Sequence, residues 1–458
     1  MGRSLLVFWV ACALAACVEG RDVVEGDGDG ARDDRDSSEG GGRDDRDDPP
    51  DDGEPDPGRP LTYYRDAKPI FDEKCTGCHV DGGIGPFPLT SYEEVEPNVA
   101  IIQVDVEAGI MPPWRAVGPL DVYEGDRRLT DTQKDTLVRW IEQGAPEGDP
   151  DDEAEAPPPA PRELSRVDQS LTIPEYTPLM DPDDYRCFPL EWPYQETKYV
   201  TGLSVEPHQT ENVHHAIVYH VQPENADATR QRDAEDPGPG YSCFGGSGTL
   251  AAWLTSYEPG GYGQAVPGDL GFEIRPGSLM LLQIHYNTLN GGRRPDQSRV
   301  DFTVSDSVDR VGRVVLLMQA LWPVGGMPIP ANVEDTMHVY RGRPSAMQPQ
   351  TTYDIYWVDL HMHALGSYGG IAIIRANGML EPLLQIPDWS YQWQETYLLR
   401  EPVKLNPGDQ LTVECHYDNT AGHQPVFNGQ RLQPRDVNWG DGTTDEMCLG
   451  NVLIAPAQ

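Results

Sequence analysis

The sequence predicts a multidomain protein in which a small all-α region, residues 61–149, precedes an all-β part that begins near residue 166. Two observations predict this order. Helix-type patterns bracket residues 75–79, whereas after residue 166 short apolar runs alternate with Gly, Pro, Asn and Asp, a pattern typical of antiparallel sandwiches. The acidic, proline-rich residues 150–165 between the two parts predict a stiff linker.

The N-terminus predicts export. Residues 1–17 open with Met1-Gly2-Arg3, continue with an apolar run and end in Leu14-Ala15-Ala16-Cys17, which is the pattern of a lipoprotein signal peptide. Cys17 is then the predicted lipid anchor, which would hold the chain to a membrane in the periplasm, at the outer membrane or at the cell surface. The alternative is an ordinary cleaved signal in which Cys17 has no role. The apolar run is too short to span a bilayer, and no later segment is long enough.

Residues 18–60 hold 17 acidic and 6 basic residues together with many Gly and Pro. Such a segment cannot bury enough apolar surface to fold, so it predicts a disordered acidic tether. The tether accounts for only part of the net charge of −41, and the remainder of the chain is therefore strongly acidic as well. Because an acidic surface repels phosphate, nucleic-acid binding is not expected.

The motif Cys75-Thr76-Gly77-Cys78-His79 is the C-x-x-C-H signature of c-type haem attachment. The thiols of Cys75 and Cys78 can form thioethers to the haem vinyl groups, and His79 can reach the iron as the proximal ligand. In a cytosolic protein a C-x-x-C pair would also fit a redox or zinc site, but predicted export and the adjacent His favour haem.

Helix-type segments at residues 66–74 and 129–141 flank this motif, and Thr130 or Asp131 is the expected cap of the second. Two helices around a haem motif resemble a small class I cytochrome c. Met111 is the only Met in the interval where a distal ligand belongs, although it would also suit a core position. A Met/His axial pair leaves no open coordination position and so favours electron transfer.

Histidines in the all-β part form two groups. His361 and His363 lie two residues apart, so on a strand both imidazoles point to one face, and Met447 could add a soft thioether ligand suited to Cu(I). His214 and His215 are adjacent, so an ideal strand would send them to opposite faces, and both can bind one metal only if the backbone bends or the rings use different nitrogens. His285 follows on a second predicted strand.

In chain order, the motifs His214-His215, Gln283-Ile284-His285-Tyr286, His361-Met362-His363 and Asp445-Glu446-Met447-Cys448 resemble those of the copper type II ascorbate-dependent monooxygenases. The resemblance covers roughly residues 166–458 and implies two jelly-roll domains, 166–307 and 308–458. It implies two copper ions. One is an electron-donating copper at His214, His215 and His285, and the other is a catalytic, oxygen-activating copper at His361, His363 and Met447.

The resemblance also implies a reaction, in which O₂ hydroxylates an aliphatic carbon of a small organic substrate with ascorbate as reductant. Family members that act on peptides carry an Arg two residues before the H-x-H pair, where it holds a substrate carboxylate. Asp359 occupies that position here. Since a negative side chain cannot anchor a carboxylate, a peptide C-terminus is a poor candidate substrate, and the identity of the substrate stays open.

Four further cysteines, Cys187, Cys243, Cys415 and Cys448, predict two disulfides in an exported chain. Three pairings are possible. The resemblance favours Cys187 with Cys243 and Cys415 with Cys448, and the second bond would fix the residue next to Met447.

A one-electron haem ahead of two coppers indicates that the haem supplies electrons to the coppers, beside or instead of ascorbate, and that a redox donor protein supplies the haem. A rival hypothesis is a copper-storage or electron-transfer lipoprotein that keeps the ligands but performs no oxygenation. A third is a surface sensor or adhesion module with structural metals. The Met ligand beside its cysteine favours the enzyme.

Overall fold

The computed structural model describes residues 59–81, 85–154, 164–181, 183–243, 246–257, 264–266, 270–288, 292–391, 393–427, 430–440 and 444–458. The predicted signal peptide (1–17), nearly all of the predicted tether (18–60) and much of the predicted linker (150–165) lie outside these residues. None of the helices in the described ranges is both long enough and apolar enough to cross a bilayer.

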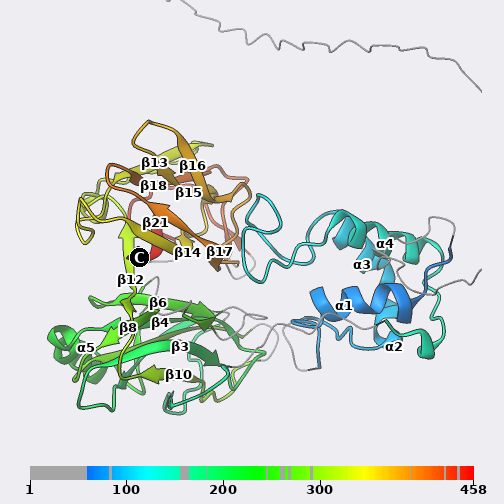
Figure 1. The fold of residues 1–458 in the computed structure, drawn as a ribbon, viewed down its shortest axis with the longest axis horizontal. Helices are drawn as coiled ribbons and strands as arrows, with labels where there is room; N and C mark the ends of the chain where they lie inside the picture. Colours follow the sequence, from blue (N-terminus) through cyan, green and yellow to red (C-terminus); the bar gives the residue numbers. More distant parts are fainter. Residues whose placement is uncertain are drawn as a thin grey trace, which may run out of the picture. The chain divides into compact units, whose positions relative to one another are not determined.

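Helices are concentrated in the first described segment, coloured blue to cyan (Figure 1). They are η1 (Tyr63–Ala67), α1 (Lys68–Lys74), α2 (Tyr92–Val95), η2 (Glu96–Asn98), α3 (Val99–Glu107), α4 (Asp131–Glu142) and η3 (Pro150–Asp152). As expected from the sequence, Thr130 caps α4, since its side chain accepts a hydrogen bond from the backbone of Gln133 at 3.1 Å. Leu137 and Trp140 on the buried face of α4 pack against Phe71 of α1 and Tyr63 of η1.

The next part of the chain forms a six-stranded and a five-stranded sheet. The first has the order β1 (Gln169–Thr172), β10 (Arg299–Ser305), β3 (Lys198–Glu206), β8 (Leu270–Ile274) and β11 (Arg310–Val311), with β7 (Gln264–Ala265) paired to β3. The second has the order β5 (Tyr241–Ser242), β2 (Asp183–Glu191), β9 (Leu279–Asn287), β4 (Val213–Val221) and β6 (Ala252–Tyr257). Helix α5 (Pro223–Glu235) follows β4. Both sheets contribute to one hydrophobic core, and β9 is buried at almost every position because it is the central strand.

Two four-stranded sheets follow. One has the order β12 (Arg313–Leu317), β21 (Leu449–Pro456), β14 (Tyr353–His361) and β17 (Thr396–Leu405), and the other has the order β13 (Thr336–Gly342), β18 (Gln410–Tyr417), β15 (Gly366–Ile374) and β16 (Leu380–Ile386). A turn, η4 (Trp322–Val324), and a small pair, β19 (Val426–Phe427) and β20 (Gln430–Arg431), complete the described elements. These sheets share a second core, and β14 is buried along its whole length.

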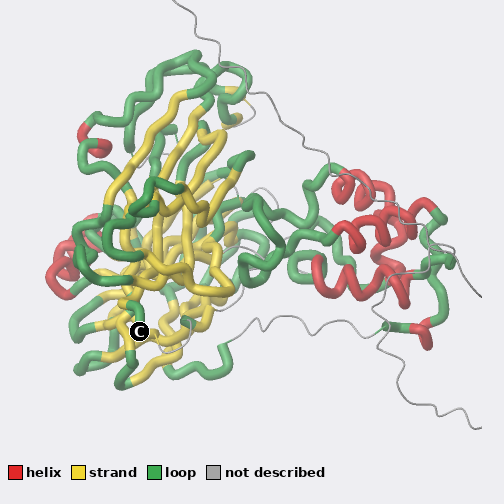
Figure 2. Tube along the Cα trace, turned by 45° about the horizontal axis from the view of Figure 1, so that its top comes forward, coloured by secondary structure: helices red, strands yellow, loops and turns green. Residues whose placement is uncertain are grey.

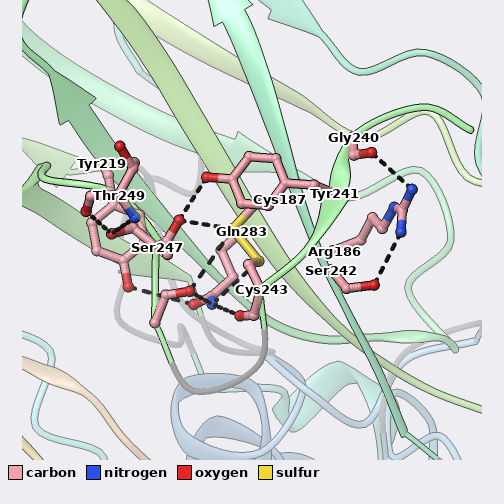
Figure 3. Close-up of a disulfide and its surroundings, with 12 residues drawn as sticks. Arg186, Cys187, Tyr219, Gly240, Tyr241, Ser242, Cys243, Ser247, Thr249 and Gln283 are labelled. Atoms are coloured by element: carbon pink, nitrogen blue, oxygen red, sulfur yellow. Dashed lines mark hydrogen bonds between the residues drawn. A yellow bond between two sulfur atoms is a disulfide. The ribbon is translucent and has the colours of Figure 1, made fainter. Parts of the chain in front are cut away.

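Both disulfides expected from the resemblance are present. Cys187 joins Cys243 across 56 residues, and Cys415 joins Cys448 across 33 residues. Figure 3 shows the first bond between β2 and the chain after β5, with Gln283 of β9 beside it. The Gln283 amide donates to the carbonyl oxygen of Cys243 at 2.8 Å, so this disulfide is tied directly to the strand that carries His285.

The predicted fold class, a small all-α cytochrome c domain followed by two jelly-roll domains, is wrong. The described chain is mostly β, built from four main sheets with few helices (Figure 2), and no separate all-α cytochrome domain is found in it. Instead, Pro55–Gln458 form one compact unit. The predicted domain boundaries inside this unit stay predictions.

The physical reason lies in the segment that follows Met111. Its backbone binds β16 and β17, with Val117 N–H donating to Gln385 at 2.9 Å and Glu124 N–H donating to Leu398 at 2.8 Å. Tyr123 is buried in the second core and its hydroxyl donates to the Leu383 carbonyl at 2.8 Å. Local helix patterns do not reveal such long-range contacts. The sequence therefore predicts a separate helical domain, whereas the helical segment is joined to the sheets.

Candidate metal centres

The first histidine cluster is formed by neighbouring strands β4 and β9. His215 lies directly opposite His285 in the antiparallel register, so their side chains share a face. The register shifts between Val213 and His215, and this irregularity brings His214 to the same side as its neighbour. The Nδ1 atoms of His214 and His285 lie 3.2 Å and 3.3 Å from Nδ1 of His215, and one nitrogen of each ring lies within 4.8 Å of the others. Three convergent imidazoles fit a copper ion.

Two side chains from β2 hold His285 in place. Asp183 lies 2.9 Å from His285 Nε2, and the Tyr185 ring stacks on the imidazole with centroids 4.1 Å apart and planes 6° apart. Burial lowers the pKa of His214, and it lowers those of His215 and His285 well below the usual value. The rings are therefore neutral at ordinary pH, which is the form that binds metal.

The second cluster begins at the end of β14. His361 and His363 are buried, and their ring centroids lie 5.2 Å apart. His361 Nδ1 contacts Oε1 of Gln394 at 2.6 Å, which fixes the tautomer with the proton on Nδ1. Nε2 of His361 is buried and meets no hydrogen-bond partner among the described residues. A buried imidazole nitrogen without a polar partner fits a metal ligand, because leaving it unmet is otherwise costly.

Glu446 organises the rest of this cluster. Its carboxylate is fully buried and accepts hydrogen bonds from the backbone N–H groups of His363 at 2.9 Å and Leu365 at 2.6 Å. It thus ties the chain after β14 to the residue before Met447. Burial raises the pKa of Glu446 to about 8 despite these hydrogen bonds. His363 Nδ1 lies 3.1 Å from the Asp445 carbonyl oxygen, so the same short segment positions a ring of the cluster as well.

A pocket of about 520 Å³ connects the predicted ligands to space that a substrate could fill. Both His361 and Met447 line it, although they are far apart in the sequence. Its other walls include Tyr219, Trp253 and Leu449. The structure thus brings His361 and Met447 to one pocket and places His363 beside His361. The walls of the pocket are mixed, since apolar and aromatic side chains meet the polar side chains of Ser247, Thr249 and Asn451.

Asp359 does not line this pocket, so it is not placed to anchor a substrate there. The side chain is 1% exposed and accepts a hydrogen bond from Nδ2 of Asn451 at 2.7 Å. Burial raises the pKa of Asp359 to about 7, against the lowering effect of that hydrogen bond. Asp359 and Asn451 are also paired in register between β14 and β21, so the carboxylate supports the sheet beneath His361.

The C-x-x-C-H motif lines a cavity of its own. Cys75, Cys78, His79 and Met111 all face this cavity, whose other walls are mainly apolar. His79 Nδ1 lies 2.9 Å from the Phe87 carbonyl oxygen, an arrangement that leaves Nε2 for a metal. Both thiols are free of disulfides, and burial raises the pKa of Cys75 to about 12. The donor set and its apolar surroundings fit a covalently held haem.

Gly85 explains why the chain after the motif can close over His79. A Cβ at this position would lie 2.6 Å from His79 Nδ1, so any larger residue would displace the imidazole from its hydrogen bond with Phe87.

Three histidines outside the predicted ligand sets have ordinary hydrogen-bond partners. His220 contacts Ser278 and Gln222, and His338 contacts the Pro328 carbonyl. His416 lies between Asp335 and Glu414. Neither Ser278 nor Gln222 belongs to a predicted ligand set, so these contacts of His220 orient no predicted ligand.

Sequence reasoning missed the supporting residues of both clusters: Asp183, Tyr185, Tyr391, Gln394 and Glu446. Glu446 was visible as a charge inside a ligand motif, and that was a usable signal. Tyr185 and Gln394 sit in stretches with no motif, and only the strand register and the path of one loop bring them to the histidines.

Comparison with known proteins agrees with this geometry. Residues 312–456 match the family model described as "Copper type II ascorbate-dependent monooxygenase, C-terminal domain". This region holds the whole second cluster. The second cluster therefore lies in a part of the chain that is similar to the C-terminal domain of copper type II monooxygenases.

Among relatives, mouse "DBH-like monooxygenase protein 2" is 24% identical over 365 residues, which cover 75% of this chain and 52% of that protein. "Tyramine beta-hydroxylase" of Caenorhabditis briggsae is 22% identical over 308 residues, which cover 65% and 49%. The chain thus spans about half the length of these relatives. A solved structure, PNGase F from Flavobacterium meningosepticum, aligns over 63% of this chain and 96% of its own at 12% identity, with a TM-score of 0.27, too weak a likeness to define the fold.

Proposed function

We propose that this protein is an exported monooxygenase that uses two copper ions and O₂ to hydroxylate an aliphatic carbon of a small organic substrate. One observation carries the proposal, namely the shared pocket of His361 and Met447. A soft thioether and imidazole nitrogens at the wall of a substrate-sized cavity are what a metal-centred oxidation requires. When bound there, copper would supply one-electron chemistry and the affinity for O₂.

The chain's own residues would bind the copper ions and orient the ligand side chains. His361, His363 and Met447 would hold the second copper, Gln394 keeps the His361 proton on Nδ1, and Glu446 fixes the turn before Met447. His214, His215 and His285 would hold the first copper. The aromatic and apolar walls formed by Tyr219 and Trp253 favour a substrate with an apolar or aromatic body.

Electrons are proposed to enter through a covalent haem. Cys75 and Cys78 would form the thioethers, with His79 and Met111 as axial ligands, because all four line one apolar cavity. Ascorbate or a redox protein would reduce this haem. The pyridine haemochrome spectrum tests the attachment, and a Cys75→Ala, Cys78→Ala variant should release haem on acid–acetone extraction, whereas the wild-type protein should retain it.

The decisive experiment measures O₂ uptake and product together. The copper-loaded, reduced protein is offered a panel of aromatic amines, lipids and small aromatic compounds under ¹⁸O₂, and hydroxylated product is sought by mass spectrometry. We expect one ¹⁸O atom per product and loss of product in His361→Ala. Two bound coppers without O₂ uptake across the whole panel would instead support the copper-carrier hypothesis.

Export and lipid attachment at Cys17 are also proposed, on the sequence pattern of residues 1–17 alone. Metabolic labelling with a radioactive fatty acid tests this part. Wild-type protein should carry the label and sediment with membranes, whereas Cys17→Ser should lose the label. A labelled Cys17→Ser protein would contradict the anchor.

A further inference from the structure

One short loop, Tyr391 and Trp393–Glu395, touches two of the three candidate redox sites and reaches the third through a tyrosine; we call it the junction loop. It lies just before β17, and its described residues contact the haem-motif cavity, the second histidine cluster and a tyrosine stacked on the first cluster. We propose that the junction loop is the internal electron route from the haem to both copper sites. This inference rests on the proposed function.

At the haem end, Trp393 lines the same cavity as Cys75, Cys78 and His79. Arg127 lines this cavity as well, and its guanidinium forms an ion pair with the buried carboxylate of Glu395. The cavity is thus closed in part by residues of the junction loop, and the ion pair holds the loop against it.

At the second cluster, Gln394 makes the closest contact, with its Oε1 atom 2.6 Å from His361 Nδ1. The other end of the same amide donates to the Tyr391 carbonyl at 2.9 Å. The Tyr391 ring lies 6.0 Å from the His363 ring, edge to face. Residue 394, next to the tryptophan at the cavity wall, therefore contacts a predicted copper ligand directly.

At the first cluster, the Tyr391 hydroxyl contacts the Tyr185 hydroxyl at 2.5 Å. The Tyr185 ring in turn stacks on His285 at 4.1 Å. A continuous chain of bonded and closely packed atoms therefore runs from the cavity wall through the junction loop to a ligand of each cluster. Bonded and closely packed atoms couple an electron donor and acceptor more strongly than an open gap of the same length does.

The electron balance is simple. One electron leaves the ferrous haem, which becomes ferric, and reduces one copper(II) to copper(I), while a one-electron donor of the ascorbate class reduces the haem again. No bond forms or breaks along the route. Trp393, Tyr391 and Tyr185 keep their protons and serve as the medium through which the electron passes.

The test follows haem absorbance rather than product. Ferrous protein loaded with copper(II) is prepared without O₂ by flash reduction of the haem, and haem oxidation is recorded. We expect Trp393→Leu to lose the fast phase, and Trp393→Phe to regain much of it because a ring returns. Tyr391→Phe should lose only the phase that belongs to the first copper, identified by its electron paramagnetic resonance signal.

Trp192→Phe is the matched control. Trp192 is buried in the first core, its indole N–H meets no hydrogen-bond partner among the described residues, and it lines none of the three sites. Its variant should oxidise haem at the wild-type rate. Haem and copper contents are measured for every variant, so a misfolded protein is recognised by lost cofactor, and Tyr391→Phe tests the route if Trp393→Leu does not fold.

The outcomes separate the two levels of the proposal. Wild-type haem oxidation rates in fully loaded Trp393→Leu and Tyr391→Phe would overturn the route and leave the proposed function standing. If bound copper(II) fails to oxidise the haem in the wild-type protein, the haem is no donor, and the proposed electron supply falls together with the route.

Discussion

Asp359 shows how a single residue can look functional in the sequence and prove structural in the fold. It occupies a position where the resembling family places a substrate anchor, yet it is buried and bonded to Asn451. No sequence pattern distinguishes these roles, because the partner lies 92 positions away on β21. The strand register decides the question.

We predict that Asn451→Ala lowers the free energy of unfolding by about 2 kcal/mol, because it leaves the buried Asp359 carboxylate without its amide donor. Urea unfolding measures the loss. A double variant with Leu at 359 and 451 should be closer to wild type, because it removes both polar partners together. An Asn451→Ala protein that unfolds at the wild-type urea concentration would contradict this role.

His220 provides a pH prediction at the same scale. Burial, and then the nearby Arg275, lowers the pKa of His220 to about 4, whereas Glu224 acts in the opposite direction. As pH falls from about 6.5 to about 4, the unfolded chain takes up a proton that the folded chain refuses, so stability decreases over this window by up to about 3 kcal/mol.

The variant His220→Gln should flatten this slope, since its amide can still bond to Ser278 and does not titrate in that range. Urea unfolding of both proteins across the window gives the difference directly. Parallel stability curves for wild type and variant would show that His220 does not couple folding to pH.

At the scale of elements, much of the all-β part was predictable. The apolar runs near residues 216–219, 280–284, 313–318 and 370–374 coincide with β4, β9, β12 and β15. The shift in register at His215 was not predictable, because alternation along one strand cannot say where its partner slips. That slip resolves the adjacency of His214 and His215, which the sequence alone left open.

The two disulfides allow a matched prediction. Loops of 56 and 33 residues give similar chain-entropy terms, so removing either bond as a Ser pair should cost about 4 kcal/mol. Their effects on copper should differ. Loss of the Cys415–Cys448 bond frees the residue next to Met447 and should lower the copper affinity of the second cluster. Loss of the Cys187–Cys243 bond loosens the contact with Gln283 and should lower the copper affinity of the first cluster.

Competitive copper titration with a chelator, combined with electron paramagnetic resonance to separate the two sites, measures this selectivity. If either variant lowered the copper affinity of both sites equally, the disulfides would act on copper binding only through the overall stability of the protein.

The whole molecule is where sequence reasoning failed most clearly. The helices that flank the C-x-x-C-H motif were located correctly, but the separate all-α domain was wrong. The helical segment joins the sheets through residues 115–127, which carry no recognisable pattern. Domain independence depends on such contacts, and a local motif says nothing about them. Trp393, which precedes β17, lines the haem-motif cavity, so the failed prediction concerns the contact on which the proposed electron route depends.

Net charge leads to a prediction for the complete protein. With a net charge of −41, the molecule attracts cationic and repels anionic electron donors over distances limited by salt. Haem reduction by a cationic ruthenium–ammine complex should therefore be fastest at low salt and slow by about tenfold at high salt. Ascorbate, an anion, should show the opposite trend.

Stopped-flow absorbance across a salt series measures both rates of haem reduction, with a neutral donor as control. Identical salt dependence for the cation and for ascorbate would mean that the acidic charge does not select the donor at the haem, and ascorbate would then be as suitable a reductant as a cationic redox protein.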